Sequence, residues 1–249
     1  MRPERAVGVH TVIVSSVLRL AVAQPISALG EIEFNVNEHS SAVRGAEARL
    51  VLFPELSLTG YAMGAEPIQW TDNRLAPLVD ACAETGSVAL AGAPSIDRIG
   101  ARRISTFRID ELGVSVVYTK VHLGGAEPEH FQPGAGPAVL EIDGWRLGLA
   151  ICKDNGQPEH AAETAKLGID AYIAGVCESE LDRDVQPRRA VRVVDDHRVW
   201  VAYASFAGPT GGGFDDTAGR SAVRGPDGVV RLHLGRRAGL CATTTLGRP

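Results

Sequence analysis

Three short apolar runs each end beside a residue that could do chemistry: run 50–53 before Glu55, run 114–119 before Lys120, and run 147–151 before Cys152. In open α/β sheets, ligands bind beyond the carboxyl ends of the strands. If these runs are buried strands, a carboxylate, an ammonium group and a thiol meet at such an edge. Together these groups are the parts of an activated cysteine nucleophile, and they indicate a hydrolase.

Each of the three side chains suits one step of such a reaction. A free thiol has a pKa near ~8.5, so Cys152 needs a base to become a good nucleophile. Glu55 can be that base if burial raises its pKa. Lys120 is charged and can stabilise the oxyanion that forms when Cys152 attacks a carbonyl carbon. The turn that follows Cys152 leads to a helix start at Pro158, so backbone N–H groups, including that of Lys153, should also face the developing charge.

The pattern along the chain indicates how these residues are positioned. Helices are expected at 32–48, from about 75 to Gly86, at 158–168 and at 187–197. Strands are expected near 18–23, 50–54, 87–92, 104–110, 114–119, 138–142, 146–152, 170–176, 199–205 and 221–231. Turn residues at 110–113, 143–144 and 226–228 indicate hairpins, which together with crossover helices predict an α/β fold with mixed sheets. The irregular stretch 124–137 is long enough to be a functional loop.

Composition narrows the class of protein. The 249 residues are 45% hydrophobic and 22% charged with a net charge of −5, which fits a globular protein and disfavours nucleic acid as a partner. No run approaches the ~18 apolar residues of a membrane span. The four cysteines contain no CxxC pair, so a cytoplasmic protein is expected rather than a zinc site or disulfide scaffold. We expect an N-terminal extension at 1–17, either a start-site artefact or a disordered arm, followed by one domain at 18–249.

Three motifs in the chain resemble those of the nitrilase, or carbon–nitrogen hydrolase, superfamily. They are LVLFPELSLTGY at 50–61, YTKVHL at 118–123 followed by EPEHFQPG at 127–134, and GLAICKD at 148–154 followed by Pro158-Glu159. Gly219-Arg220-Ser221 near the end of the chain also fits. Jointly the motifs are specific, and the resemblance covers about residues 18–231.

The resemblance implies a fold and a mechanism. The expected fold is an αββα sandwich whose subunits pair into an αββααββα assembly, so a homodimer or larger homo-oligomer is expected. Glu55 would be the general base, Lys120 the oxyanion stabiliser and Cys152 the nucleophile, which forms a thioester with the acyl part of an amide. Neither a metal nor an organic cofactor is implied.

The resemblance also implies a second glutamate near the lysine. The family often has this residue four positions before the aromatic residue of an F-x-P-G segment, and Phe131 then selects Glu127. Its expected role is to position Lys120 and the substrate amine, with Glu129 as the competing assignment. Tyr61, Lys153 and Cys177 are expected to bind substrate. The extra cation at Lys153 is expected to attract a substrate carboxylate.

The residues around the cysteine bear on the choice of substrate. The Cys-Trp-Glu sequence typical of nitrile hydrolysers is absent, since Lys153 and Asp154 follow Cys152. This departure favours an ω-amide or an N-carbamoyl compound of a small molecule, with release of ammonia. Nitrile hydrolysis or acyl transfer on the same fold remains an alternative, and a non-catalytic binding subunit is a more distant one.

Overall fold

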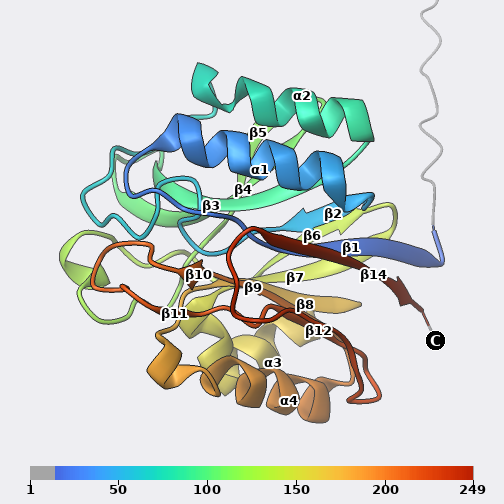
Figure 1. The fold of residues 1–249 in the computed structure, drawn as a ribbon. Coiled ribbons are helices and arrows are strands. Elements are labelled where there is room, and N and C mark those ends of the chain that lie inside the picture. Colours follow the sequence, from blue (N-terminus) through green and yellow to red (C-terminus); the bar gives the residue numbers. More distant parts are fainter. Residues whose placement is uncertain (1–14, 249) are drawn as a thin grey trace, which may run out of the picture.

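Two stacked sheets with a pair of helices on each outer side form four layers (Figure 1). The structure is a computed structural model that describes residues 15–248. Helices α1 (Ile32–Ala46) and α2 (Ala76–Thr85) cover one sheet, and α3 (Pro158–Lys166) and α4 (Val185–His197) cover the other. This arrangement confirms the predicted αββα sandwich. No helix within the described residues is long and apolar enough to cross a membrane.

The first sheet has the order β14-β1-β2-β3-β4-β5. Its strands are β1 (Val17–Gln24), β2 (Leu50–Leu52), β3 (Val88–Ile96), β4 (Arg102–Asp110), β5 (Gly113–Thr119) and β14 (Leu240–Gly247). The neighbours β1, β2 and β3 are parallel, whereas β4, β5 and β14 pair antiparallel. The sheet is therefore mixed, as predicted.

The second sheet has the order β13-β12-β9-β8-β7-β6. Its strands are β6 (Ala138–Ile142), β7 (Trp145–Ile151), β8 (Ala171–Val176), β9 (Trp200–Ser205), β12 (Ala222–Arg224) and β13 (Val230–His233). The central strands β7, β8 and β9 are parallel and the outer ones antiparallel. A separate small ribbon joins β10 (Ala207–Gly208) to β11 (Thr217–Ala218). The parallel strands β8 and β9 are buried along their whole length, as their apolar sequences require.

Short 3₁₀ turns complete the element order: η1 (Asn73–Leu75), η2 (Glu127–Glu129), η3 (Cys152–Gly156) and η4 (Glu180–Asp182). Local sequence explains several element ends. Pro158 is the first residue of α3, a position at which a backbone N–H would have no partner within the helix. Gly86 ends α2 in the left-handed conformation, with a φ of 65°.

Some expectations about element bounds were wrong. The strand expected at 221–231 is two strands, β12 and β13, because the turn at 226–228 interrupts it. Strand β14 was not predicted at all. On α4, Val194 is fully buried whereas Val191 is 39% exposed. Val17, assigned to the N-terminal extension, already pairs with Gly247 in β1, and residues 1–14 of that extension lie outside the described residues.

Candidate active site

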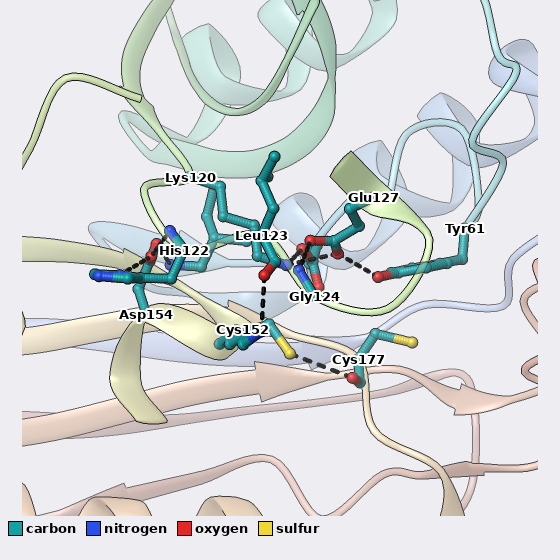
Figure 2. A network of polar contacts seen from close by, with 12 residues as sticks. Tyr61, Lys120, His122, Leu123, Gly124, Glu127, Cys152, Asp154 and Cys177 are labelled. Atoms are coloured by element: carbon teal, nitrogen blue, oxygen red, sulfur yellow. Dashed lines mark hydrogen bonds and ion pairs between the residues drawn. The ribbon is translucent and has the colours of Figure 1, made fainter. Parts of the chain in front are cut away.

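Glu55, Lys120 and Cys152 follow β2, β5 and β7 respectively. The structure brings Lys120 and Cys152 close together between the two sheets, as Figure 2 shows, and Glu55 contacts Lys120. The ammonium Nζ of Lys120 lies 2.6 Å from Oε1 of Glu55 and 2.6 Å from Oε1 of Glu127. All three of these side chains are at most 1% exposed. A lysine held between two buried carboxylates is thus the centre of the site.

Two glycines allow the turn that carries Glu55 to enter the space between the sheets. A Cβ atom at Gly92 of β3 would lie 2.2 Å from the backbone nitrogen of Leu56. A Cβ atom at Gly175 of β8 would lie 2.8 Å from the backbone oxygen of Phe53. Because any larger residue at either position would push the turn away, both sheets are shaped to place Glu55.

Cys152 occupies a sharp turn between β7 and η3. Its φ of 41° lies in the left-handed region, which a non-glycine residue rarely adopts and which occurs often at functional sites. Its thiol donates a hydrogen bond to the backbone oxygen of Cys177 at 3.4 Å, while the sulfur of Cys177 points away (Figure 2). Oε1 of Glu178 lies 3.8 Å from the same thiol. The Cys152 thiol is therefore presented at a strand end, as expected for such a turn.

The carboxylate of Asp154 joins this turn to the end of β5. It is fully buried and accepts hydrogen bonds from the backbone nitrogens of Ile151 at 3.1 Å and His122 at 2.7 Å and from the hydroxyl of Tyr118 at 2.7 Å. Lys120 lies between two of these donors in the chain. Asp154 consequently fixes the lysine and the cysteine relative to each other, a role that the sequence did not reveal.

The buried charges perturb one another. Burial raises the pKa of Glu55 to about 8, although the charge of Lys120 opposes that rise. Burial by itself would lower the pKa of Lys120, but Glu55, Cys152 and Glu127 outweigh it, so the net pKa is raised and the ammonium stays charged. Burial, and then the charge of Glu55, raise the pKa of the Cys152 thiol. The resting sulfur is thus a thiol that requires a base.

The structure distinguishes the two candidates for the second glutamate. Glu127 is 1% exposed, contacts Lys120, and accepts hydrogen bonds from the hydroxyl of Tyr61 and the backbone nitrogen of Gly124. Glu129 is exposed two residues further on. Glu127 is therefore the glutamate that the fold brings to the lysine.

A cavity of about 360 Å³ opens beside the thiol. Its walls include Lys120, Glu127, Cys152 and the three residues predicted to bind substrate, Tyr61, Lys153 and Cys177. Lys153 donates a hydrogen bond from Nζ to the backbone oxygen of Leu123 at 2.8 Å. Burial raises the pKa of the Cys177 thiol. Sequence reasoning missed four further wall residues, Met63, Glu178, Arg189 and Phe214, which belong to no motif that it used.

Comparisons with known proteins identify the relatives of this chain. The profile of the carbon-nitrogen hydrolase family matches residues 19–244. A hydrolase encoded in the pqqF 5′ region of Pseudomonas protegens is 28% identical, over 91% of this chain and 82% of its own. An amidase of the nitrilase superfamily from Nesterenkonia AN1 is 25% identical, with a TM-score of 0.80 over 92% of this chain and 90% of that one.

Two further solved structures extend the comparison. One is Nit3 from Saccharomyces cerevisiae, a member of branch 10 of the nitrilase superfamily. It is 20% identical and has a TM-score of 0.83 over 94% of this chain and 92% of its own, which shows the shared fold. A mutant of the Nesterenkonia amidase is 25% identical to this chain, with a TM-score of 0.82 over 92% of this chain and 90% of that one. Its structure shows covalent addition of the acetamide moiety of fluoroacetamide at the active-site cysteine. Because the family profile covers nearly the whole sequence, this chain belongs to the carbon–nitrogen hydrolase family of the nitrilase superfamily.

Proposed function

We propose that this protein is a thiol amidohydrolase that cleaves a non-peptide C–N bond of a small-molecule amide and releases ammonia. The observation that carries the proposal is the buried Glu55–Lys120–Glu127 cluster next to a cysteine at a strained turn that opens to a cavity. The amidase from Nesterenkonia supports it, because its active-site cysteine adds an acetamide moiety covalently.

We infer the reaction from the chemistry of these groups. Glu55 takes the thiol proton of Cys152, and the sulfur forms a bond to the amide carbonyl carbon. The charge that develops on the carbonyl oxygen is stabilised by the ammonium of Lys120 and by the backbone N–H of Lys153. Glu55 then gives its proton to the leaving nitrogen, so that ammonia departs and a thioester remains.

Water completes the cycle. Glu55 removes a proton from a water molecule, the resulting oxygen attacks the thioester carbon, and the C–S bond breaks. The proton returns to the sulfur, which yields a carboxylic acid and free Cys152. Glu127 holds Lys120 through both half-reactions, because its carboxylate is 2.6 Å from Nζ.

The cavity sets the size of the substrate. A volume of about 360 Å³ is at the lower end of sites for small molecules, so a short acyl group fits. The residues after Cys152 lack the pattern of nitrile hydrolysers, which favours ω-amides and N-carbamoyl compounds.

The test is ammonia release from a panel of ω-amides, N-carbamoyl compounds, aliphatic amides and nitriles. The native protein should release ammonia from one class of amide, and Cys152→Ala should lose the activity by several orders of magnitude. Cys241→Ala is the matched control, because Cys241 lies in β14 and not in the cavity wall. Equal ammonia release by the native protein and Cys152→Ala would refute the proposal. Carboxylate formed from nitriles only, or hydroxamate formed faster than acid when hydroxylamine is present, would indicate the alternative chemistries.

A further inference from the structure

Glu178 lies in the cavity wall and has no role in the proposed mechanism. It lies two residues after the end of β8, and its side chain is 15% exposed in the wall of the cavity. Its Oε1 atom lies 3.8 Å from the sulfur of Cys152. A charged side chain this close to the reacting sulfur will contact any group bound near the substrate carbonyl.

The two oxygens of Glu178 have different surroundings. Oε1 accepts hydrogen bonds from Nε2 of Gln186 at 2.7 Å and from a guanidinium nitrogen of Arg189 at 3.0 Å, besides its contact with the Cys152 thiol. Oε2 has no hydrogen-bond partner among residues 15–248, and it is not among the buried side-chain oxygens that lack one. Gln186 and Arg189 therefore hold the carboxylate in place while one oxygen stays available to a ligand.

Arg189 is the cation nearest to this carboxylate, and its orientation limits what it can bind. One guanidinium nitrogen faces Glu178 and the backbone oxygen of Cys152. The rest of the guanidinium lies against Gly156, where a Cβ atom would be 2.9 Å from its carbon and from its two other nitrogens. On this wall the carboxylate, rather than the guanidinium, makes the contact with the reacting sulfur.

An anionic Glu178 works against formation of the Cys152 thiolate, although Arg189 already pairs with one of its oxygens. The charge of Glu178 is one of the effects that raise the pKa of the Cys152 thiol, after burial and the charge of Glu55. Burial in turn raises the pKa of Glu178 itself. A positively charged group bound at Oε2 would offset both effects, because it neutralises the carboxylate beside the nucleophile.

We propose that Glu178 binds a positively charged amino group of the substrate and selects amides that carry this group on the α or β carbon. This inference rests on the proposed amidohydrolase function and narrows its substrate class. In a near-attack geometry the carbonyl carbon lies about 3–3.5 Å from the sulfur. An α-amino nitrogen is about 2.5 Å from that carbon, and a charge-assisted contact to carboxylate is about 2.8 Å. The sulfur is 3.8 Å from Oε1 of Glu178, so the free Oε2 of the same carboxylate lies in the region that these lengths can span, and one more methylene adds only about 1.5 Å.

The test compares pairs of amides that differ in charge and hardly in shape. Alaninamide is paired with isobutyramide, and β-alaninamide with butyramide, at pH 7, where the amino groups are largely protonated. The native protein should hydrolyse the ammonium member of at least one pair with a kcat/KM at least about tenfold higher, chiefly through a lower KM. A ratio at or below one in both pairs overturns the inference, and this result needs no variant.

Variants then assign the preference to one residue. Glu178→Gln keeps the size of the side chain and can still accept from Gln186, and it should bring the ratio within each pair close to one. Glu180→Gln is the control, since Glu180 is two residues further on and pairs with Arg220 at 2.6 Å outside the cavity wall. It should keep the native ratio. A native ratio retained in Glu178→Gln also overturns the inference.

Two outcomes separate this inference from the proposed function. If succinamate is preferred to every uncharged and ammonium-bearing amide, the site selects anions, the inference is wrong and the amidohydrolase proposal stands. If no amide in the panel is hydrolysed, the proposed function itself fails.

Discussion

Lowering the pH from 9 to 6 should reduce kcat/KM about a hundredfold for an uncharged amide, because Glu55 must lose its proton to act as a base. Burial raises the pKa of this carboxyl to about 8. One pH unit below that value about a tenth of the carboxyl is ionised, and two units below about a hundredth. Lys120 stays charged throughout the interval, since its neighbours raise its pKa further. The rate should therefore rise with pH and level off above about pH 9.

The assay is initial-rate ammonia release from butyramide at low substrate concentration, measured from pH 5.5 to 9.5. Because the substrate is uncharged, the rising limb of the plot of kcat/KM against pH reports a group of the free enzyme. Glu127→Gln should be slower and should move the limb to lower pH, because the charge of Glu127 is among the effects that raise the pKa of Glu55. Glu129→Gln removes an exposed carboxylate from the same 3₁₀ turn and should leave the limb in place.

A kcat/KM that is constant between pH 6 and 8 would refute this reasoning. It would mean that Glu55 is already ionised at pH 6, or that another group removes the thiol proton. A limb that stays fixed in Glu127→Gln would show that the two carboxylates do not interact as their shared contact with Lys120 requires.

Three substitutions test other parts of the structure. Tyr61→Phe removes the hydroxyl that donates to Glu127 and should lower kcat/KM about tenfold in steady-state assays, with little change in melting temperature. Wild-type kinetics in that variant would show that this hydrogen bond does not matter. Asp154→Asn puts an NH₂ group where buried N–H donors now meet carboxylate oxygens, and it should lower the free energy of unfolding by about 2–4 kcal/mol in urea titrations. A loss below about 0.5 kcal/mol would contradict that role. Gly92→Ala should destabilise the fold by about 1–3 kcal/mol and lower activity, because its Cβ atom would meet the backbone nitrogen of Leu56, and an unchanged melting curve would contradict the close packing.

Much of the site could be predicted because its residues stand at or shortly after the ends of apolar strands. Glu55, Lys120 and Cys152 follow β2, β5 and β7, and in open α/β sheets ligands bind beyond the carboxyl ends of the strands. The resemblance selected Glu127 from its spacing to Phe131, but the sequence left Glu129 as a competing assignment, since both lie in one short turn. Only the fold shows that Glu127 faces inward to Lys120 while Glu129 faces solvent.

Other features left no signal in the sequence. Glu178 and Arg189 meet because α4 returns past the turn at Cys152, and this contact depends on tertiary packing that no local pattern encodes. Strand β14 was missed because its run of threonines is only partly buried, so it lacks the apolar alternation by which strands are recognised. It forms by pairing with β1, which is more than two hundred residues away in the chain.

The most direct test of the account is to find the covalent intermediate on Cys152. The protein is mixed with an excess of a hydrolysed amide, quenched with acid during turnover, digested and analysed by mass spectrometry. We predict that the peptide with Cys152 gains the mass of the acyl group, and that Cys152→Ala shows neither this adduct nor ammonia release. An acyl group on a different residue, or undiminished ammonia release by Cys152→Ala, would contradict it.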